Sequence, residues 1–242
     1  MSASDKVPPV KAMVFDVFGT VVDWRSSLIA DFTQWSAKRG VSGDWTGLVD
    51  AWRGAYVPSM NEVRNHPERG YLALDSLHRQ SLDKLVAQFG IKGLNADDLA
   101  YMTLGWHRLK PWPDSVGGLT RLKGKFVIGT LSNGNVALLT NMAKHAGLPW
   151  DLILSAELFE HYKPDREVYL GAARLLGLLP EQVMMVAAHN NDLRAAQALG
   201  LKTCFVPRPT EYGPLQDKDF KPDGDWDVVA TDFDDFASRM GC

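Results

Sequence analysis

Cysteine is scarce in this chain, and so are the features that would attach a protein to a membrane or to nucleic acid. Cys204 and Cys242 are its only cysteines among 242 residues, too few for a disulfide framework, so a reducing cytoplasm is the expected location. Lysine and arginine form no cluster and the net charge is -3, which argues against nucleic acid or an anionic membrane as the main partner. No apolar run approaches the roughly 20 residues that span a bilayer.

The first eleven residues, MSASDKVPPVK, lack the charged-then-apolar layout of a signal peptide, and they are expected to form a frayed tail. Internal repeats and low-complexity segments are also missing. The chain does have the composition of an ordinary globular protein, with 45% hydrophobic and 23% charged residues. Its length suits one large domain, or a core with a smaller companion.

Short apolar runs recur along the chain and predict the fold class. They occupy residues 12–17, 125–131, 183–188, 202–207 and 227–230. Because each run is continuously hydrophobic, it is typical of a parallel strand covered on both faces. Helical patterns lie between the runs, at 136–147, 166–177 and 191–200. This alternation predicts an α/β fold with a doubly wound, Rossmann-like parallel sheet.

Residues 22–108 interrupt that alternation. They contain helix-like stretches at 26–39, 46–64, 71–90 and 95–105, and no convincing buried strand. We therefore expect a mostly helical cap domain, inserted after the first strand, in residues 22–108. Residues 1–21 and 109–242 would form the catalytic core. The segment 207–226, rich in Pro, Asp and Gly, is expected to be a surface loop.

Polar residues gather where the expected strands end. In open α/β sheets, ligands bind at the carboxyl ends of the strands, so these residues are candidates for one site. They come from four segments: Asp16 and Thr20; Ser132 and Asn133; Lys163 and Tyr169; His189, Asn190 and Asp192.

The motifs around these residues resemble those of a known family. The segments DVFGTVVDW, LSNGN, YKPDREVY and AAHNNDL are similar to those of the haloacid dehalogenase superfamily, and within it to the type II L-2-haloacid dehalogenases. The resemblance covers about residues 11 to 209. It implies an enzyme that hydrolyses carbon–halide bonds and converts short-chain (S)-2-haloacids to (R)-2-hydroxyacids. It further implies a small 2-haloalkanoate substrate, a halide product and no cofactor.

Two departures from the phosphatase branch of that superfamily favour this activity. Phosphatases carry a second aspartate where this chain has Phe18, and that aspartate protonates the leaving group. Ala188 occupies the place of an acid that helps to hold Mg²⁺, and without that oxygen ligand a Mg²⁺ site is poorly furnished. A halide leaves as a stable anion and needs no proton, so displacement at a carbon–halogen bond needs no general acid.

The resemblance also implies roles for the candidate residues. Asp16 would attack C2 of the substrate and form an aspartyl ester. Lys163 would keep Asp16 ionised, and Asp192 would orient Lys163 and help to position or deprotonate the hydrolytic water. Thr20 would hydrogen-bond an oxygen of Asp16 or its loop.

The remaining candidates concern the substrate. Arg53 matches the family's arginine that receives the halide, and its planar donor fork suits that task. The other expected substrate-binding residues are Ser132 and Asn133 for the carboxylate, Phe18 as an apolar wall, Tyr169 and Asn190. Trp24, Tyr56 and Met60 are further candidates for the apolar wall.

Relatives commonly carry Ser and Asn at the places of Ala187 and His189, so we expect a change in how the water is handled. The hypothesis is that His189 acts as polar partner or base in ester hydrolysis. Three alternatives stay open: a hydrolase of another small activated carboxylate, a metal-dependent phosphatase, and a non-catalytic carboxylate-binding protein. Relatives are often homodimers, and a homodimer is a further expectation.

Overall fold

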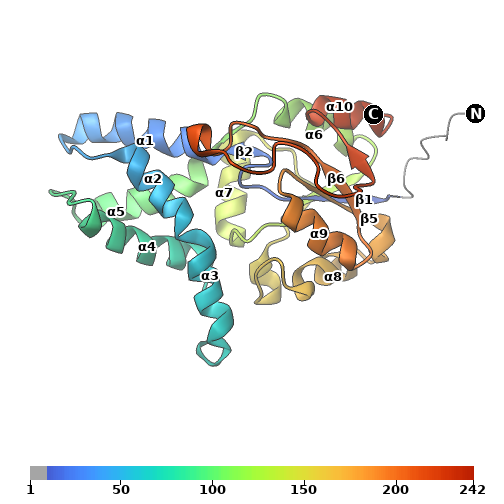
Figure 1. Ribbon diagram of the computed structural model, residues 1–242, viewed down its shortest axis with the longest axis horizontal. Coiled ribbons are helices and arrows are strands. Elements are labelled where there is room, and N and C mark those ends of the chain that lie inside the picture. Colours follow the sequence, from blue (N-terminus) through green and yellow to red (C-terminus); the bar gives the residue numbers. More distant parts are fainter. Residues whose placement is uncertain (1–9) are drawn as a thin grey trace, which may run out of the picture.

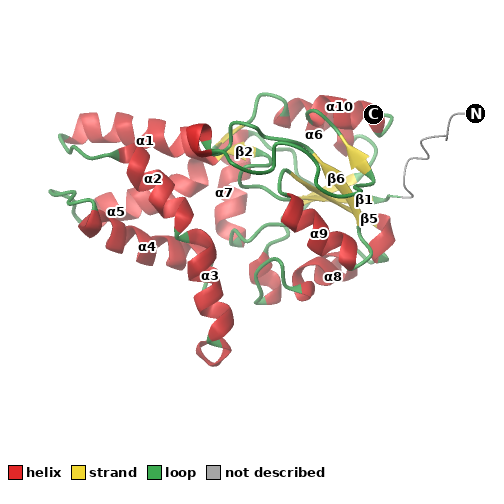
Figure 2. Ribbon diagram, viewed as in Figure 1, coloured by secondary structure: helices red, strands yellow, loops and turns green. Residues whose placement is uncertain are grey.

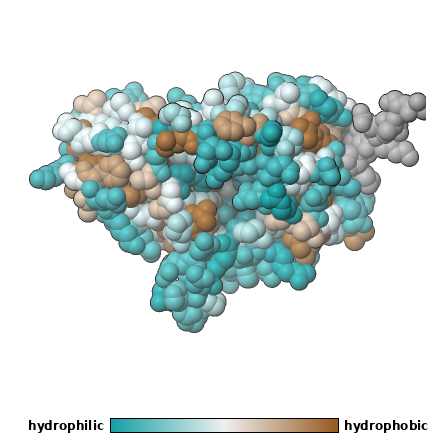
Figure 3. Space-filling model, viewed as in Figure 1, coloured by the Kyte–Doolittle hydropathy of each residue, from teal (hydrophilic) through white to brown (hydrophobic). Residues whose placement is uncertain are grey.

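A computed structural model gives the fold, and it describes residues 10–242 (Figure 1). Most of the expected amino-terminal tail, residues 1–9, lies outside the described residues. None of the helices from residue 10 onward is long and apolar enough to cross a membrane. The face seen in Figure 3 is largely hydrophilic, with separate hydrophobic spots.

All five expected strands are present and form one parallel sheet. They are β1 (Ala12–Phe15), β4 (Val127–Thr130), β5 (Val183–Ala187), β6 (Lys202–Phe205) and β7 (Val228–Val229). Their order is β4-β1-β5-β6-β7, so β1 runs between two partners, with Phe15 paired to Thr130 on one side and Val186 on the other. Asp16 therefore leaves the sheet at its carboxyl edge, between β4 and β5.

Helices cover both faces of this sheet, as a doubly wound fold requires. In Figure 1, α6 (Ser115–Lys123) and α10 (Phe233–Arg239) lie above it, and α8 (Arg166–Leu175) and α9 (Asn190–Ala198) lie below it. The helix α7 (Val136–Ala146) follows β4, and Gly147 ends it in the left-handed conformation, which glycine adopts without strain. Short 3-10 turns complete the connections: Ala156–Phe159, Pro180–Gln182 and Gly213–Leu215.

The region between Trp24 and Arg108 is helical, and Figure 2 shows it beside the sheet. Its helices are α1 (Trp24–Arg39), α2 (Trp45–Gly54), α3 (Tyr56–Asn65), α4 (Leu74–Gln88) and α5 (Ala96–Thr103), with 3-10 turns at Pro67–Arg69 and Leu104–Arg108. The expected helical stretch 46–64 is two helices, because the chain turns at Ala55.

The chain leaves and re-enters the α/β region at one place. There β2 (Val22–Asp23) pairs antiparallel with β3 (Lys110–Pro111). Two adjacent connections are what an inserted domain needs. We propose that residues 22–108 form the helical cap domain and that residues 1–21 and 109–242 form the core.

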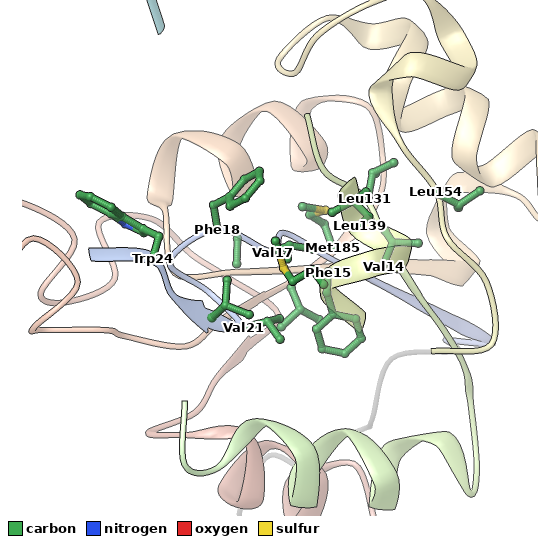
Figure 4. Close-up of a cluster of buried hydrophobic side chains, with 14 of the residues drawn as sticks. Val14, Phe15, Val17, Phe18, Val21, Trp24, Leu131, Leu139, Leu154 and Met185 are labelled. Carbon is green, nitrogen blue, oxygen red and sulfur yellow. The ribbon is translucent and has the colours of Figure 1, made fainter. Parts of the chain in front are cut away.

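Buried hydrophobic side chains extend from the sheet into the helical region. Figure 4 shows Val14, Phe15 and Met185 within this cluster, and Phe18 and Trp24 continue it beyond the end of β1. Phe18 packs edge-on against Trp106, with ring centroids 5.6 Å apart. The same apolar cluster therefore supports the turn after β1 and the helices over it.

The segment 207–226 was expected to be a surface loop, and that prediction is wrong for part of it. Arg208, Glu211 and Trp226 are buried. Arg208 donates to the backbone oxygen of Thr20 and forms two hydrogen bonds with Asp114. These bonds hold the loop against the turn that follows β1, so a segment of polar composition covers the edge of the sheet.

Candidate active site

Asp16 is the first residue after β1, and its carboxylate accepts hydrogen bonds from three side chains. Oδ1 accepts from Nζ of Lys163 at 3.0 Å, and Oδ2 accepts from the Thr20 hydroxyl at 2.8 Å. The Nδ1 atom of His189 lies 3.1 Å from Oδ2. Thr20 also accepts from the backbone N–H of Ala188, so its hydroxyl joins the ends of β1 and β5.

Lys163 is held by a second carboxylate and, through its own backbone N–H, by the side chain of Asn133. Its Nζ donates to Oδ2 of Asp192 at 2.5 Å, and the other oxygen of Asp192 accepts from the Tyr169 hydroxyl at 2.6 Å. The side-chain oxygen of Asn133 accepts from the Lys163 backbone N–H at 2.7 Å. Both Asp192 oxygens are thus engaged, and Tyr169 touches this network rather than merely packing.

The two carboxylates that share Lys163 have opposite pKa shifts. Burial opposes the charge of Asp16, but Lys163, His189 and Thr20 outweigh it and hold the pKa of Asp16 well below its ordinary value. Burial and the charge of Asp16 raise the pKa of Asp192, and Lys163 offsets them only in part. The pKa of Lys163 is raised, since the two carboxylates overcome the effect of burial. Asp16 is therefore held in its ionised form by the cations beside it.

His189 connects Asp16 to a residue that the sequence analysis missed. The Nε2 atom of His189 lies 2.8 Å from Oε2 of Glu211, whose other oxygen accepts from the indole N–H of Trp24 at 3.0 Å. Glu211 belongs to the 207–226 loop, where no motif or periodic pattern marks it. Its only sequence signal is its nearness to β6, the strand after the fourth motif.

Arg53, from α2, is partly buried between aromatic rings. Its guanidinium carbon lies 4.4 Å from the ring centre of Tyr56 and 5.4 Å from that of Trp24. Nη2 is 3.8 Å from Glu211, whereas buried Nη1 has no hydrogen-bond partner among the described residues. A buried donor without a partner costs about 1–3 kcal/mol, so this nitrogen is suited to an anion that enters the site.

One cavity of about 720 Å³ brings most of the predicted residues together. Trp24, Tyr56 and Met60 line it as well, and so do nine predicted site residues: Asp16, Phe18, Arg53, Asn133, Lys163, Tyr169, His189, Asn190 and Asp192. Thr20 is buried behind Asp16. Ser132 is fully buried, and its hydroxyl oxygen accepts from the backbone N–H of Gly134.

Asn190 reaches the cavity wall, but its side-chain amide is used within the fold. The amide nitrogen donates to Asp219 and to the Lys221 carbonyl, and the amide oxygen accepts from Asp223 N–H and from the Trp226 indole. Asn190 therefore fastens the 207–226 loop to the start of α9, and its amide is committed to that loop rather than to a ligand.

The carboxylates of this site do not form a metal-binding cluster. Among residues 10–242, no group of three or more His, Cys, Asp or Glu side chains is placed to hold a metal ion. Asp16 and Asp192 are each bonded to the ammonium of Lys163, so a cation of the protein occupies the space between them.

Comparison with known proteins identifies the family. The family model of haloacid dehalogenase-like hydrolases matches residues 10–200, and the chain belongs to this family, as its motifs predicted. Among curated relatives, it is 30% identical over 211 residues to (S)-2-haloacid dehalogenase 1 of Pseudomonas sp. (strain CBS-3), covering 84% of this chain and 88% of that protein.

Solved structures show the same relationship at higher identity. An L-2-haloacid dehalogenase shares 50% of its sequence with this chain at a TM-score of 0.93, covering 96% of this chain and 99% of that one. A defluorinating L-2-haloacid dehalogenase shares 45% at a TM-score of 0.92, covering 96% of each chain. The fold class predicted from the sequence is confirmed.

Proposed function

We propose that this protein hydrolyses short-chain (S)-2-haloacids to (R)-2-hydroxyacids through an ester formed on Asp16. The observation that carries the proposal is the pairing of two groups in one cavity. One is the ionised carboxylate of Asp16, and the other is the guanidinium of Arg53, whose buried Nη1 has no partner among the described residues. A nucleophile and a receptor for a leaving anion are the two requirements of halide displacement.

In the first step, an Asp16 oxygen attacks C2 of the substrate. The C2–halogen bond breaks, and the halide leaves with the bonding electrons toward Arg53, so no proton is transferred. Lys163 and Thr20 hold the carboxylate in place for this attack. Phe18 stands where a phosphatase has its acid, and its buried ring gives the reacting carbon an apolar wall.

In the second step, water attacks the Asp16 carbonyl carbon and the ester bond to that carbon breaks. The C2–oxygen bond formed in the first step stays intact, so C2 is inverted once. Asp192 orients Lys163, and His189 contacts the Asp16 carboxylate from a second ion-pairing direction. Asn133 is the residue best suited to the substrate carboxylate, since it lines the cavity beside Lys163.

The proposal includes two features of the whole protein. The reaction uses a small 2-haloalkanoate and water and needs no cofactor. A cytoplasmic location is supported by the two cysteines, Cys204 and Cys242, which are both free. The expected homodimer stays a prediction.

The proposal is tested by halide release from each enantiomer of 2-chloropropionate. We expect chloride from the (S) form at the same rate with and without a chelator, and (R)-lactate as the product. The variant Asp16→Asn removes the nucleophile and should release chloride at least about 10³-fold more slowly than the native protein. Mass spectrometry must exclude deamidation back to aspartate. Fluoroacetate is worth including, because one relative is named for defluorination.

Other outcomes would assign a different activity. Phosphate release from a monoester that requires Mg²⁺ would favour the phosphatase. Native activity in the Asp16→Asn protein would contradict the covalent mechanism.

A further inference from the structure

His189 lies between two buried carboxylates, and only one of them belongs to the nucleophile. Its Nδ1 is 3.1 Å from Asp16 and its Nε2 is 2.8 Å from Glu211. Lys163 lies beyond Asp16, and Arg53 lies beyond Glu211. Both ring nitrogens of His189 are therefore engaged by anions, each of which also faces a cation.

The side chain of Glu211 is held in place by several contacts, although it belongs to a loop. It is 1% exposed, it accepts from the Trp24 indole, and its carboxylate lies against the backbone of Gly19. A Cβ atom at Gly19 would lie 2.0 Å from Oε1 of Glu211, and Gly19 has a φ of +84°. A side chain at position 19 would thus collide with Glu211 and strain the turn. Because Glu211 is held, the ring of His189 is held with it.

The two carboxylates determine the charge of His189 in the resting site. Burial disfavours an imidazolium, but Glu211 and Asp16 outweigh burial and raise the pKa of His189 well above its ordinary value. His189 is consequently protonated on both nitrogens before substrate reacts. In that state it cannot accept a proton from water.

Formation of the ester changes this balance, because the ester of Asp16 carries no charge. We infer that ester formation releases the Nδ1 proton of His189 to solvent, and that Glu211 then holds the neutral ring as the base for ester hydrolysis. This inference rests on the proposed function and adds to it a positioning residue, Glu211, and a proton that leaves in the first half of the reaction. Burial disfavours the charged ring, and after ester formation only the carboxylate of Glu211 still favours it.

The hydrolytic step balances with this assignment. Neutral His189 takes a proton from water at Nδ1 as the water oxygen bonds to the Asp16 carbonyl carbon. The resulting imidazolium gives that proton to the oxygen of the departing 2-hydroxyacid as the ester bond breaks. The new Asp16 carboxyl then loses its own proton to His189, which restores the resting pair. Over one turnover, one halide and one proton are released.

Asp192 is the other candidate for the base in ester hydrolysis, and its contacts argue against that role. One of its oxygens accepts from Lys163 and the other from Tyr169. Both oxygens of Asp192 are thus taken up by donors, whereas His189 lies directly against the Asp16 carboxylate. Asp192 therefore positions Lys163, and His189 is the group placed to serve water at the ester.

The experiment compares three variants with the native protein in single turnovers of (S)-2-chloropropionate. His189→Gln and Glu211→Gln should still release chloride but accumulate the ester, detected as a mass adduct, with hydrolysis slowed about 10- to 100-fold. Glu211→Asp keeps the charge and should recover part of that loss. Glu181→Gln, an exposed site, is the matched control.

Proton release, followed with an indicator in weak buffer, gives the second measurement. In Glu211→Asp, one proton should appear with each chloride; in His189→Gln, it should appear only with the hydroxyacid. A proton that accompanies the hydroxyacid in Glu211→Asp, or equal slowing of both steps in Glu211→Gln without ester, would overturn the inference. Absence of chloride release by the native protein would instead contradict the proposed function.

Discussion

The guanidinium of Arg53 is held mainly by aromatic faces rather than by a close ion pair. It stacks over Tyr56 and Trp24, and its nearest carboxylate oxygen, on Glu211, is 3.8 Å away. Cation–π contact stabilises the charge without using the N–H donors. This leaves Nη1 available to an anion, and a close carboxylate would have competed with the halide for it.

Arg53→Lys separates the charge from the donor fork. Lysine keeps the charge but loses the planar stacking and the second donor, so we expect kcat/KM for chloride release to fall about 10- to 100-fold, the equivalent of one or two lost charged hydrogen bonds. Arg69→Lys, an exposed position, should stay close to native. Steady-state kinetics with (S)-2-chloropropionate measures the effect, and a change below twofold would remove Arg53 from halide binding.

The site residues that the sequence could predict are those inside motifs at strand ends. Asp16, Lys163 and Asp192 meet because parallel strands bring their carboxyl ends to one edge. Glu211 could not be found in this way. Its position depends on how the 207–226 loop folds back over the turn after β1, and composition alone indicated only a polar surface segment.

At the scale of elements, this loop is the least regular part of the site and one of its most important supports. It carries Glu211 to His189, and the side chain of Asn190 fastens its later part to α9. Regular elements were easier to predict than this loop, since hydrophobic periodicity marks them. The two-residue strands β2 and β3 were not predicted, because their pairing joins residues far apart in sequence.

Asn190→Ala should loosen this loop. The substitution leaves the buried Trp226 indole N–H and the Asp223 N–H without their acceptor, which should lower the free energy of unfolding by about 1–3 kcal/mol. Hydrogen exchange should become faster in residues 216–226, and urea denaturation gives the loss of stability. Asn191→Ala, an exposed position on the same helix, is the control, and equal exchange in the two variants would contradict the fastening role.

At the scale of the whole molecule, the helical region and the sheet share an apolar junction that contains a buried histidine. The ring of His78 stacks on Trp106, with centroids 4.4 Å apart. Neither ring nitrogen has a hydrogen-bond partner among the described residues. Burial lowers the pKa of His78 to about 3, Arg53 and His107 add to the effect, and Asp75 opposes it. His78 is therefore neutral in the folded protein.

His78 should make the fold less stable in mild acid. An unfolded histidine takes up a proton below about pH 6.5, whereas folded His78 does so only near pH 3. Between these values the unfolded chain binds more protons than the folded protein. The contribution of His78 to the free energy of unfolding is therefore complete above about pH 6.5 and is lost as the pH falls. From about pH 7 to about pH 5, this one group should cost about 2 kcal/mol. Urea unfolding at both pH values measures this loss in the free energy of unfolding. In His78→Phe, which keeps an aromatic ring against Trp106, the loss should be smaller than in the native protein by that amount. The control is His145→Gln, at an exposed position, which should lose as much stability as the native protein does. If His78→Phe also loses as much as the native protein, His78 is not the neutral, buried group at this junction.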